Sequence, residues 1–225
     1  MNISTKILMG FFGSAFVYMS AVFIEIRLTG EDVDIHGEDA KVESVPIDNI
    51  KYVIIADLGQ RIYLKSSDKP GLEFRSASGD LASRLVYEIN GDTLNLRELN
   101  LEENTKLDIT LLVPQELVGI EVNEAAVYLS DLKQPRLSII QTGGRTVFNQ
   151  GVKIGKLDIT ATESAEFDAF GGDIDTVALD LDNSDVELRT NVGRLEGSMK
   201  NRSYLYIEDI NDISFKKDEN SHLKL

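Results

Sequence analysis

Residues 157–188 read LDITATESAEFDAFGGDIDTVALDLDNSDVEL, which is one repeat unit followed by most of a second. Each unit has a run that alternates apolar and polar residues, a polar corner, and a second short run, as in residues 157–160, 162–164 and 165–168. Asn, Asp, Ser and Gly gather at the corners, where they favour tight turns. The stretch therefore predicts two short β-strands and two turns in every unit.

The unit recurs through the second half of the chain with a period near 20 residues. One series of strand-leading apolar residues has spacings of 20, 20, 20, 18 and 18, and it comprises Leu117, Leu137, Leu157, Val177, Leu195 and Ile213. A second series lies about ten residues further along each unit and comprises Val127, Val147, Phe167, Val186 and Leu205. Stacked coils with such a period form long parallel sheets whose inward residues make continuous apolar columns.

These columns predict an all-β fold, a right-handed parallel β-helix (β-solenoid) with coils of about 20 residues. The right hand follows from the strong bias of parallel crossover connections. Leucine-rich repeats have a similar period, but they require a longer consensus and a helical return leg, which the sequence lacks. The acidic residues between the column positions, such as Asp158 and Asp168, are expected to face solvent.

The first half of the chain contains further alternating runs, which predict strands at residues 52–55, 61–65, 71–75, 85–89, 93–96 and 106–113. Asn90 and Gly91 separate two of these runs, and Asn-Gly between alternating strands is a strong signal for a β-hairpin. No persuasive helical period occurs after residue 28, so the folded part is predicted to be all-β.

The N-terminal segment is predicted to be a membrane anchor. An uncharged run of 18 residues begins at Ile7 and ends at Ile24, and as a helix it would be about 27 Å long, close to the bilayer core of about 30 Å. Lys6 precedes the run and acidic residues follow it, which places the N-terminus in the cytoplasm and the remainder in the periplasmic or extracytoplasmic space. A cleaved signal peptide and a buried helix of a cytosolic protein are the alternatives.

The predicted organisation is a signal-anchor over residues 1–27, an acidic linker over 28–48, a β-helix domain over 49–215 and a polar tail over 216–225.

The composition of the chain argues against several classes of function. The 38 acidic residues exceed the 23 basic ones and give a net charge of −15, which opposes nucleic-acid binding. The absence of Cys excludes disulfides and thiol nucleophiles, and the two histidines, His36 and His222, offer little for histidine-centred catalysis.

Three features resemble a bacterial family, the autotransporter-adhesin head domain called the GIN domain, found in exported proteins of Bacteroidetes-like genomes. They are the strand-turn-strand at residues 53–64, the hairpin at 87–94, and the coils with Asp-Asn-Ser and Lys-Asn-Arg-Ser corners. The similar region covers roughly residues 50–215. The resemblance implies a β-helical fold and an envelope location, and it supplies no catalytic residues.

Acidic residues are the main lead for chemistry, because β-helices host enzymes that act on polysaccharides with paired carboxylates. The cluster consists of Asp173, Asp175, Asp180, Asp182 and Asp185. A solvated strand and corner explains it more simply, since acidic residues are usually exposed. The segment FGGDID at 170–175 matches a calcium-binding repeat only in part and does not recur, so no metal and no cofactor are predicted.

Tyr204 and Tyr206 flank the inward residue Leu205 and are predicted to face outward on one strand, where they could stack on a sugar or contact another protein. The sequence therefore predicts a membrane-anchored module with a structural, adhesin-like or binding role and no enzyme activity. The membrane and an envelope protein or polysaccharide are the expected partners. An accessory subunit of a membrane complex and a carbohydrate-active β-helix enzyme are the alternatives.

Overall fold

The structure is a computed structural model, and it describes residues 18–19, 40–47, 49–76, 79, 85–99 and 107–225. The chain divides into two units, Met1–Asp34 and Ile35–Leu225, and the description below concerns the second. Its seventeen strands are β1 Lys41–Pro46, β2 Tyr52–Ala56, β3 Arg61–Ser66, β4 Gly71–Ser76, β5 Leu85–Asn90, β6 Thr93–Leu99, β7 Leu107–Val113, β8 Gly119–Asn123, β9 Ala126–Ser130, β10 Lys133–Thr142, β11 Arg145–Phe148, β12 Lys153–Thr162, β13 Glu166–Ala169, β14 Asp173–Asp182, β15 Asp185–Lys200, β16 Tyr204–Lys217 and β17 His222–Lys224.

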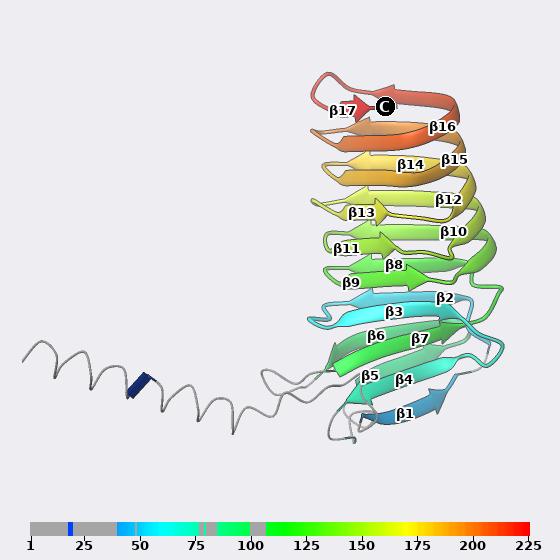
Figure 1. Ribbon diagram of the computed structural model, residues 1–225, viewed down its shortest axis with the longest axis vertical. Helices are drawn as coiled ribbons and strands as arrows, with labels where there is room; N and C mark the ends of the chain where they lie inside the picture. The colour runs from blue at the N-terminus through cyan, green and yellow to red at the C-terminus, as the bar shows by residue number, and fades with distance from the viewer. Residues whose placement is uncertain (1–17, 20–39, 48, 77–78, 80–84, 100–106) are drawn as a thin grey trace, which may run out of the picture. The chain divides into compact units, whose positions relative to one another are not determined.

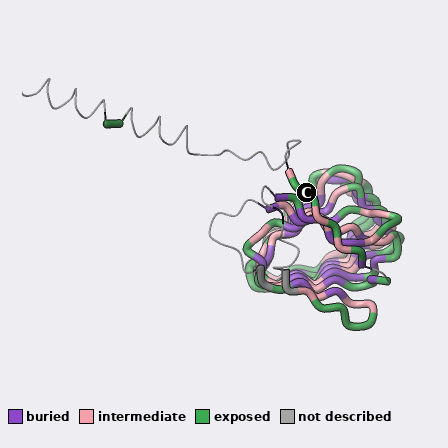
Figure 2. The backbone as a smooth tube through the Cα atoms, turned by 90° about the horizontal axis from the view of Figure 1, so that it is seen from below, coloured by how far each residue is buried: buried purple, intermediate pink, exposed green. Residues whose placement is uncertain are grey.

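The second unit is a β-solenoid, as the repeat predicts (Figure 1). Two parallel ladders run along it. Ladder A contains β6, β2, β8, β10, β12, β14 and the C-terminal halves of β15 and β16. Ladder B contains β7, β3, β9, β11, β13, the N-terminal halves of β15 and β16, and β17. The buried residues line the space between the two ladders (Figure 2).

The first apolar series forms a column in ladder A over five coils. Leu137, Leu157, Val177, Leu195 and Ile213 pair in direct succession. Leu117 is buried, but it precedes β8, whose first residue Gly119 pairs with Ser138. Leu117 therefore lies one residue out of the column.

The second series forms a column in ladder B with one correction. Val127, Phe167, Val186 and Leu205 occupy it, but their partner in β11 is Thr146 and not Val147. Val147 pairs with Tyr128 and Asp168 on the outer face. The shift arises because two residues, 143 and 144, turn the corner before β11, whereas three residues turn the corner before β13.

The corners lie where the sequence predicts them, and positive backbone φ angles explain their composition. Glu124, Gly143, Glu163, Asn183 and Asn201 all have φ between 47° and 62°. Asn is among the residues that enter this left-handed region most readily. At Gly144, also at positive φ, a Cβ atom would lie 2.3 Å from the carbonyl oxygen of Ala125, so only glycine fits there.

The N-terminal end of the solenoid departs from a purely parallel β-helix. β4 pairs antiparallel with both β1 and β7, and β5 pairs antiparallel with β6. The predicted hairpin between β5 and β6 is confirmed, although Gly91 and Asp92 form its turn and Asn90 ends β5. The coil of β2 and β3 lies between β6–β7 and β8–β9, so the order of the coils in space differs from their order in the chain.

Two strands lie in the flanking stretches of the expected β-helix domain. β1 lies within residues 28–48, the expected acidic linker, and β17 lies within residues 216–225, the expected polar tail, and pairs with Tyr204, Leu205 and Tyr206 of β16. Of the expected membrane anchor, the structure describes only Tyr18 and Met19. Within the described residues, no helix has the length and apolar character needed to cross a membrane.

Candidate recognition surface

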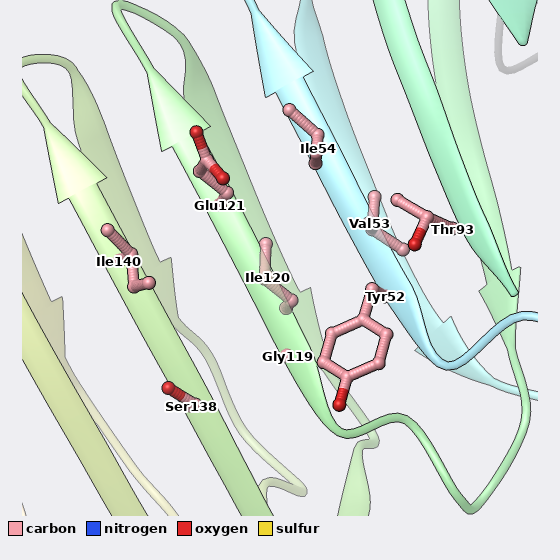
Figure 3. A pocket seen from close by; sticks show the side chains of 9 residues that line it. All are labelled: Tyr52, Val53, Ile54, Thr93, Gly119, Ile120, Glu121, Ser138 and Ile140. Carbon is pink, nitrogen blue, oxygen red and sulfur yellow. The ribbon is translucent and has the colours of Figure 1, made fainter. Parts of the chain in front are cut away.

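A shallow apolar groove lies on the outer face of ladder A (Figure 3). It crosses β2, β8 and β10, and its volume is about 240 Å³. Strand pairing sets its layout, because Tyr52, Gly119 and Ser138 are neighbours in one outward row, and Ile54, Glu121 and Ile140 are neighbours in the next. Segments from both halves of the chain therefore build the groove.

Gly119 creates the hollow. A Cβ atom at this position would lie 3.2 Å from a ring carbon of Tyr52, so the absence of a side chain lets that ring lie beside β8. The Tyr52 side chain remains 43% exposed and Ile140 remains 49% exposed. Outward positions on the later coils of the same row carry Thr160 and Asp180 instead. The groove is thus an apolar patch on an otherwise polar face.

The charge in the groove is confined to one rim residue. Glu121 Oε1 accepts a hydrogen bond from Asn123 Nδ2 at 3.0 Å, which holds the carboxylate toward the corner of the coil. Exposed apolar patches bounded by polar residues are typical of sites that bind a partner. The lining suits an aliphatic or aromatic group of a partner.

Tyr204 and Tyr206, the residues singled out from the sequence, lie on the outer face of ladder B. They flank the fully buried Leu205, and both are half-buried. Two cations lie over the ring of Tyr206: Arg189 at 5.8 Å and Lys224 at 5.1 Å from the ring centroid. Arg189 also lies over Phe170, at 5.7 Å. These contacts are of cation–π type, and they join three strands into one aromatic and cationic cluster. A recognition role for the two tyrosines stays a prediction.

Asp168 corrects the expectation that the acidic residues beside the columns are solvated. Its side chain is 11% exposed, and its Oδ2 accepts hydrogen bonds from both Nε and Nη2 of Arg145, the former at 2.9 Å. The hydrogen bond with Asp168 raises the pKa of Arg145 above its ordinary value, and the nearby Glu166 acts in the same direction. Asp158 conforms better to the expectation, because its side chain is 25% exposed and pairs with Arg136 and Lys156 at the surface.

The acidic residues of the cluster lie on the outer face of β14 and at the start of β15. Asp180 and Asp182 share the outer face of β14, but Asp182 is held by Asn201 at 2.6 Å and Lys200 at 3.4 Å, and Asp173 pairs with Lys153 at 3.7 Å. In the part of the chain that the structure describes, no three His, Asp or Glu side chains are placed to hold a metal ion.

The groove was missed by sequence reasoning, although a signal for it exists. Alternation places Val53 and Ile55 inward, so the intervening Tyr52 and Ile54 face outward as apolar residues. Ile140 has the same position in β10. The local sequence pattern does not reveal the order of the coils in space, which brings β2 next to β8 and β8 next to β10.

A comparison with models of known protein families finds a match to this chain. A profile of the family described as "Putative auto-transporter adhesin, head GIN domain" matches residues 53–190, more than half of the chain. The chain belongs to this family. The match to the GIN domain confirms the resemblance inferred from the strand-turn-strand, the hairpin and the corners.

Solved structures of similar fold carry related descriptions. A "putative adhesin" from Parabacteroides distasonis is 14% identical, with a TM-score of 0.63, and the match covers 82% of this chain and 80% of that one. A "putative adhesin" from Bacteroides fragilis is 15% identical, with a TM-score of 0.58 and coverage of 84% and 97%. A "putative lipid binding protein" from Parabacteroides distasonis is 11% identical, with a TM-score of 0.54 and coverage of 84% and 97%. Comparison with curated proteins gave no match.

Proposed function

We propose that this GIN-domain chain is an adhesin-like binding module that is held outside the cytoplasm by its N-terminal apolar segment and recognises its partner through the groove at Gly119. The observation that carries the proposal is the exposed apolar lining of Tyr52 and Ile140 on a face that is otherwise polar. A partner that inserted an apolar group there would remove this surface from water, which is the main driving force of association.

The family and the arrangement of side chains both support binding without catalysis. Asp158 and Asp182 take part in surface ion pairs, and Asp168 is held by an arginine. The cluster of Tyr206 with Arg189 and Lys224 on ladder B provides a second contact surface with stacking and cationic groups. The 18-residue uncharged run that ends at Ile24 supports attachment to the membrane.

Binding measurements on groove variants test the proposal. The full chain in detergent micelles would be immobilised and exposed to three probes: lipid vesicles, envelope polysaccharide and purified envelope proteins. Vesicles are included because one solved structure of this fold is described as lipid binding. We expect saturable binding of one probe. Gly119→Val, which fills the hollow, and Ile140→Glu, which places a charge in it, should each weaken that binding about tenfold or more, as expected for residues at the centre of an interface.

Asp180→Asn is the matched control, because Asp180 lies on the same outward row two coils beyond Ile140. It should leave binding unchanged, and all variants should keep the melting temperature of the native protein. Equal binding by the native protein and both groove variants would refute the groove as the recognition site. If Tyr206→Ala weakened binding and neither groove variant did, the recognition site would lie on ladder B instead.

A further inference from the structure

The last coil of the solenoid leaves its apolar column partly uncovered. Leu137, Leu157, Val177 and Leu195 are fully buried, whereas Ile213, the next residue in that column, is 37% exposed. Its neighbours on the inward face, Ile210, Phe215 and Leu223, are also only partly buried. A coil stacked on this end would bury these side chains as the inner coils bury theirs.

The backbone at this end is open as well. Residues 209–217 of β16 pair with β15 on one side, and no described strand pairs with their other edge. The opposite end of the solenoid differs, because antiparallel β4 and β1 follow β7 there, and β1 ends at Pro46. An open strand edge next to apolar side chains is a template for pairing with another strand.

We propose that this end of the solenoid binds a second copy of the same chain, through antiparallel pairing of residues 211–217 of β16 across a two-fold axis. The proposal is independent of the groove and of the function assigned to it. The argument for a second copy is that the edge is complementary to itself when its direction is reversed.

Alternation requires the two-fold axis to pass through a residue, and the charges of the strand select that residue. Asp212, Ser214 and Lys216 face outward, because their partners Arg194, Glu196 and Ser198 lie on the outer face of β15. Ile213 faces inward, beside Leu195. Antiparallel pairing that keeps inward residues opposite inward residues can centre on Ser214. It then sets Asp212 opposite Lys216 of the second copy and Ile213 opposite its Phe215.

The two ends of the solenoid distinguish this arrangement from open-ended stacking. Open-ended stacking would set the edge of β16 against the opposite end of another copy, where the antiparallel strands β4 and β1 lie. The antiparallel pair instead makes two ion pairs of opposite sign. A two-fold contact also closes on itself, so it yields a dimer and not a filament.

The net charge of the whole chain does not oppose this contact. The chain carries −15, but residues 209–225 contain four acidic residues, Asp209, Asp212, Asp218 and Glu219, against three lysines, Lys216, Lys217 and Lys224. The formal charge of these side chains is therefore −1. Long-range repulsion from the other coils is screened over about 8 Å at physiological ionic strength.

A single cysteine on the two-fold axis tests the register. The chain has no Cys, so Ser214→Cys introduces a unique thiol. Residues directly opposite in an antiparallel pair have Cα atoms about 4.5–5.5 Å apart, within the range that a disulfide spans. Under mild oxidation the full chain with Ser214→Cys, in detergent micelles, should form a covalent dimer that a reductant separates.

Ser198→Cys is the matched control, because Ser198 is exposed on the same outer face one coil further in. It should give little dimer. In the Ser214→Cys background, Lys216→Asp should lower the yield of dimer about tenfold, and adding Asp212→Lys should restore it, because the two ion pairs are then rebuilt with reversed sign. Equal cross-linking by the two cysteine variants, or a yield that Lys216→Asp leaves unchanged, would overturn the proposal.

Discussion

Neighbouring side chains in one coil have very different environments, and their substitutions should differ accordingly. Leu157 and Phe167 are fully buried. Replacing either by Ala should cost about 2–5 kcal/mol through lost burial and the cavity that remains. Asp158, next to Leu157, takes part in surface ion pairs with Arg136 and Lys156, and such pairs contribute only about 0–1 kcal/mol.

Asp168→Asn should destabilise the fold more than Asp158→Asn. Asp168 is nearly buried, and the substitution would leave the Arg145 guanidinium without its charged acceptor, at a cost of about 1–3 kcal/mol. Asp158→Asn should cost less than about 1 kcal/mol. Urea unfolding of the two variants, with Leu157→Ala as a reference for a core residue, measures the difference. Equal midpoints for the two aspartate variants would show that the Arg145–Asp168 pair contributes no more than a solvated one.

The corners make the stability of the solenoid depend on pH. The hydrogen bond from Asn201 Nδ2, together with Lys200, holds the pKa of Asp182 below its ordinary value of 3.8. A carboxylate with a lowered pKa stabilises the folded state above its ordinary pKa, and this contribution is lost as the pH falls through the folded-state pKa. The melting temperature of native protein should therefore exceed that of Asp182→Asn at about pH 5, and the difference should shrink below pH 3.8.

Asn201→Gly provides the control for this prediction, because it removes the donor, tolerates the positive φ of this corner and leaves the carboxylate in place. At about pH 5 its melting temperature should lie below that of the native protein by most of the difference seen for Asp182→Asn. A constant difference between native protein and Asp182→Asn from about pH 2 to 7 would show that the effect of the substitution is not electrostatic.

The strands and corners of the solenoid could be predicted because each depends on local sequence. Two-residue alternation defines the strands, and Asn183 and Gly143 mark turns that need positive φ. The column through Thr146 was misplaced because corners of two and three residues look alike in the sequence. The position of β2–β3 between β6–β7 and β8–β9 could not be predicted, since it depends on long-range pairing that no local pattern encodes. The groove depends on that pairing and was missed with it.

On the scale of the whole molecule, the solenoid provides surfaces of different character. Ladder A carries the apolar groove, ladder B carries the aromatic and cationic cluster, and the last coil exposes the edge of β16. The proposed function uses the groove on ladder A outside the cytoplasm. It therefore depends on the N-terminal segment, which lies outside the described residues apart from Tyr18 and Met19.

The most direct test is to measure on which side of the membrane the solenoid lies. A reporter that is active only outside the cytoplasm would be fused after Leu225, and a second fusion would carry a reporter that is active only inside it. We predict activity from the first reporter alone, in a protein that stays in the membrane pellet after a carbonate wash, because Lys6 should retain the N-terminus in the cytoplasm. Activity from the cytoplasmic reporter alone would contradict the claim that this chain is a binding module displayed beyond the membrane.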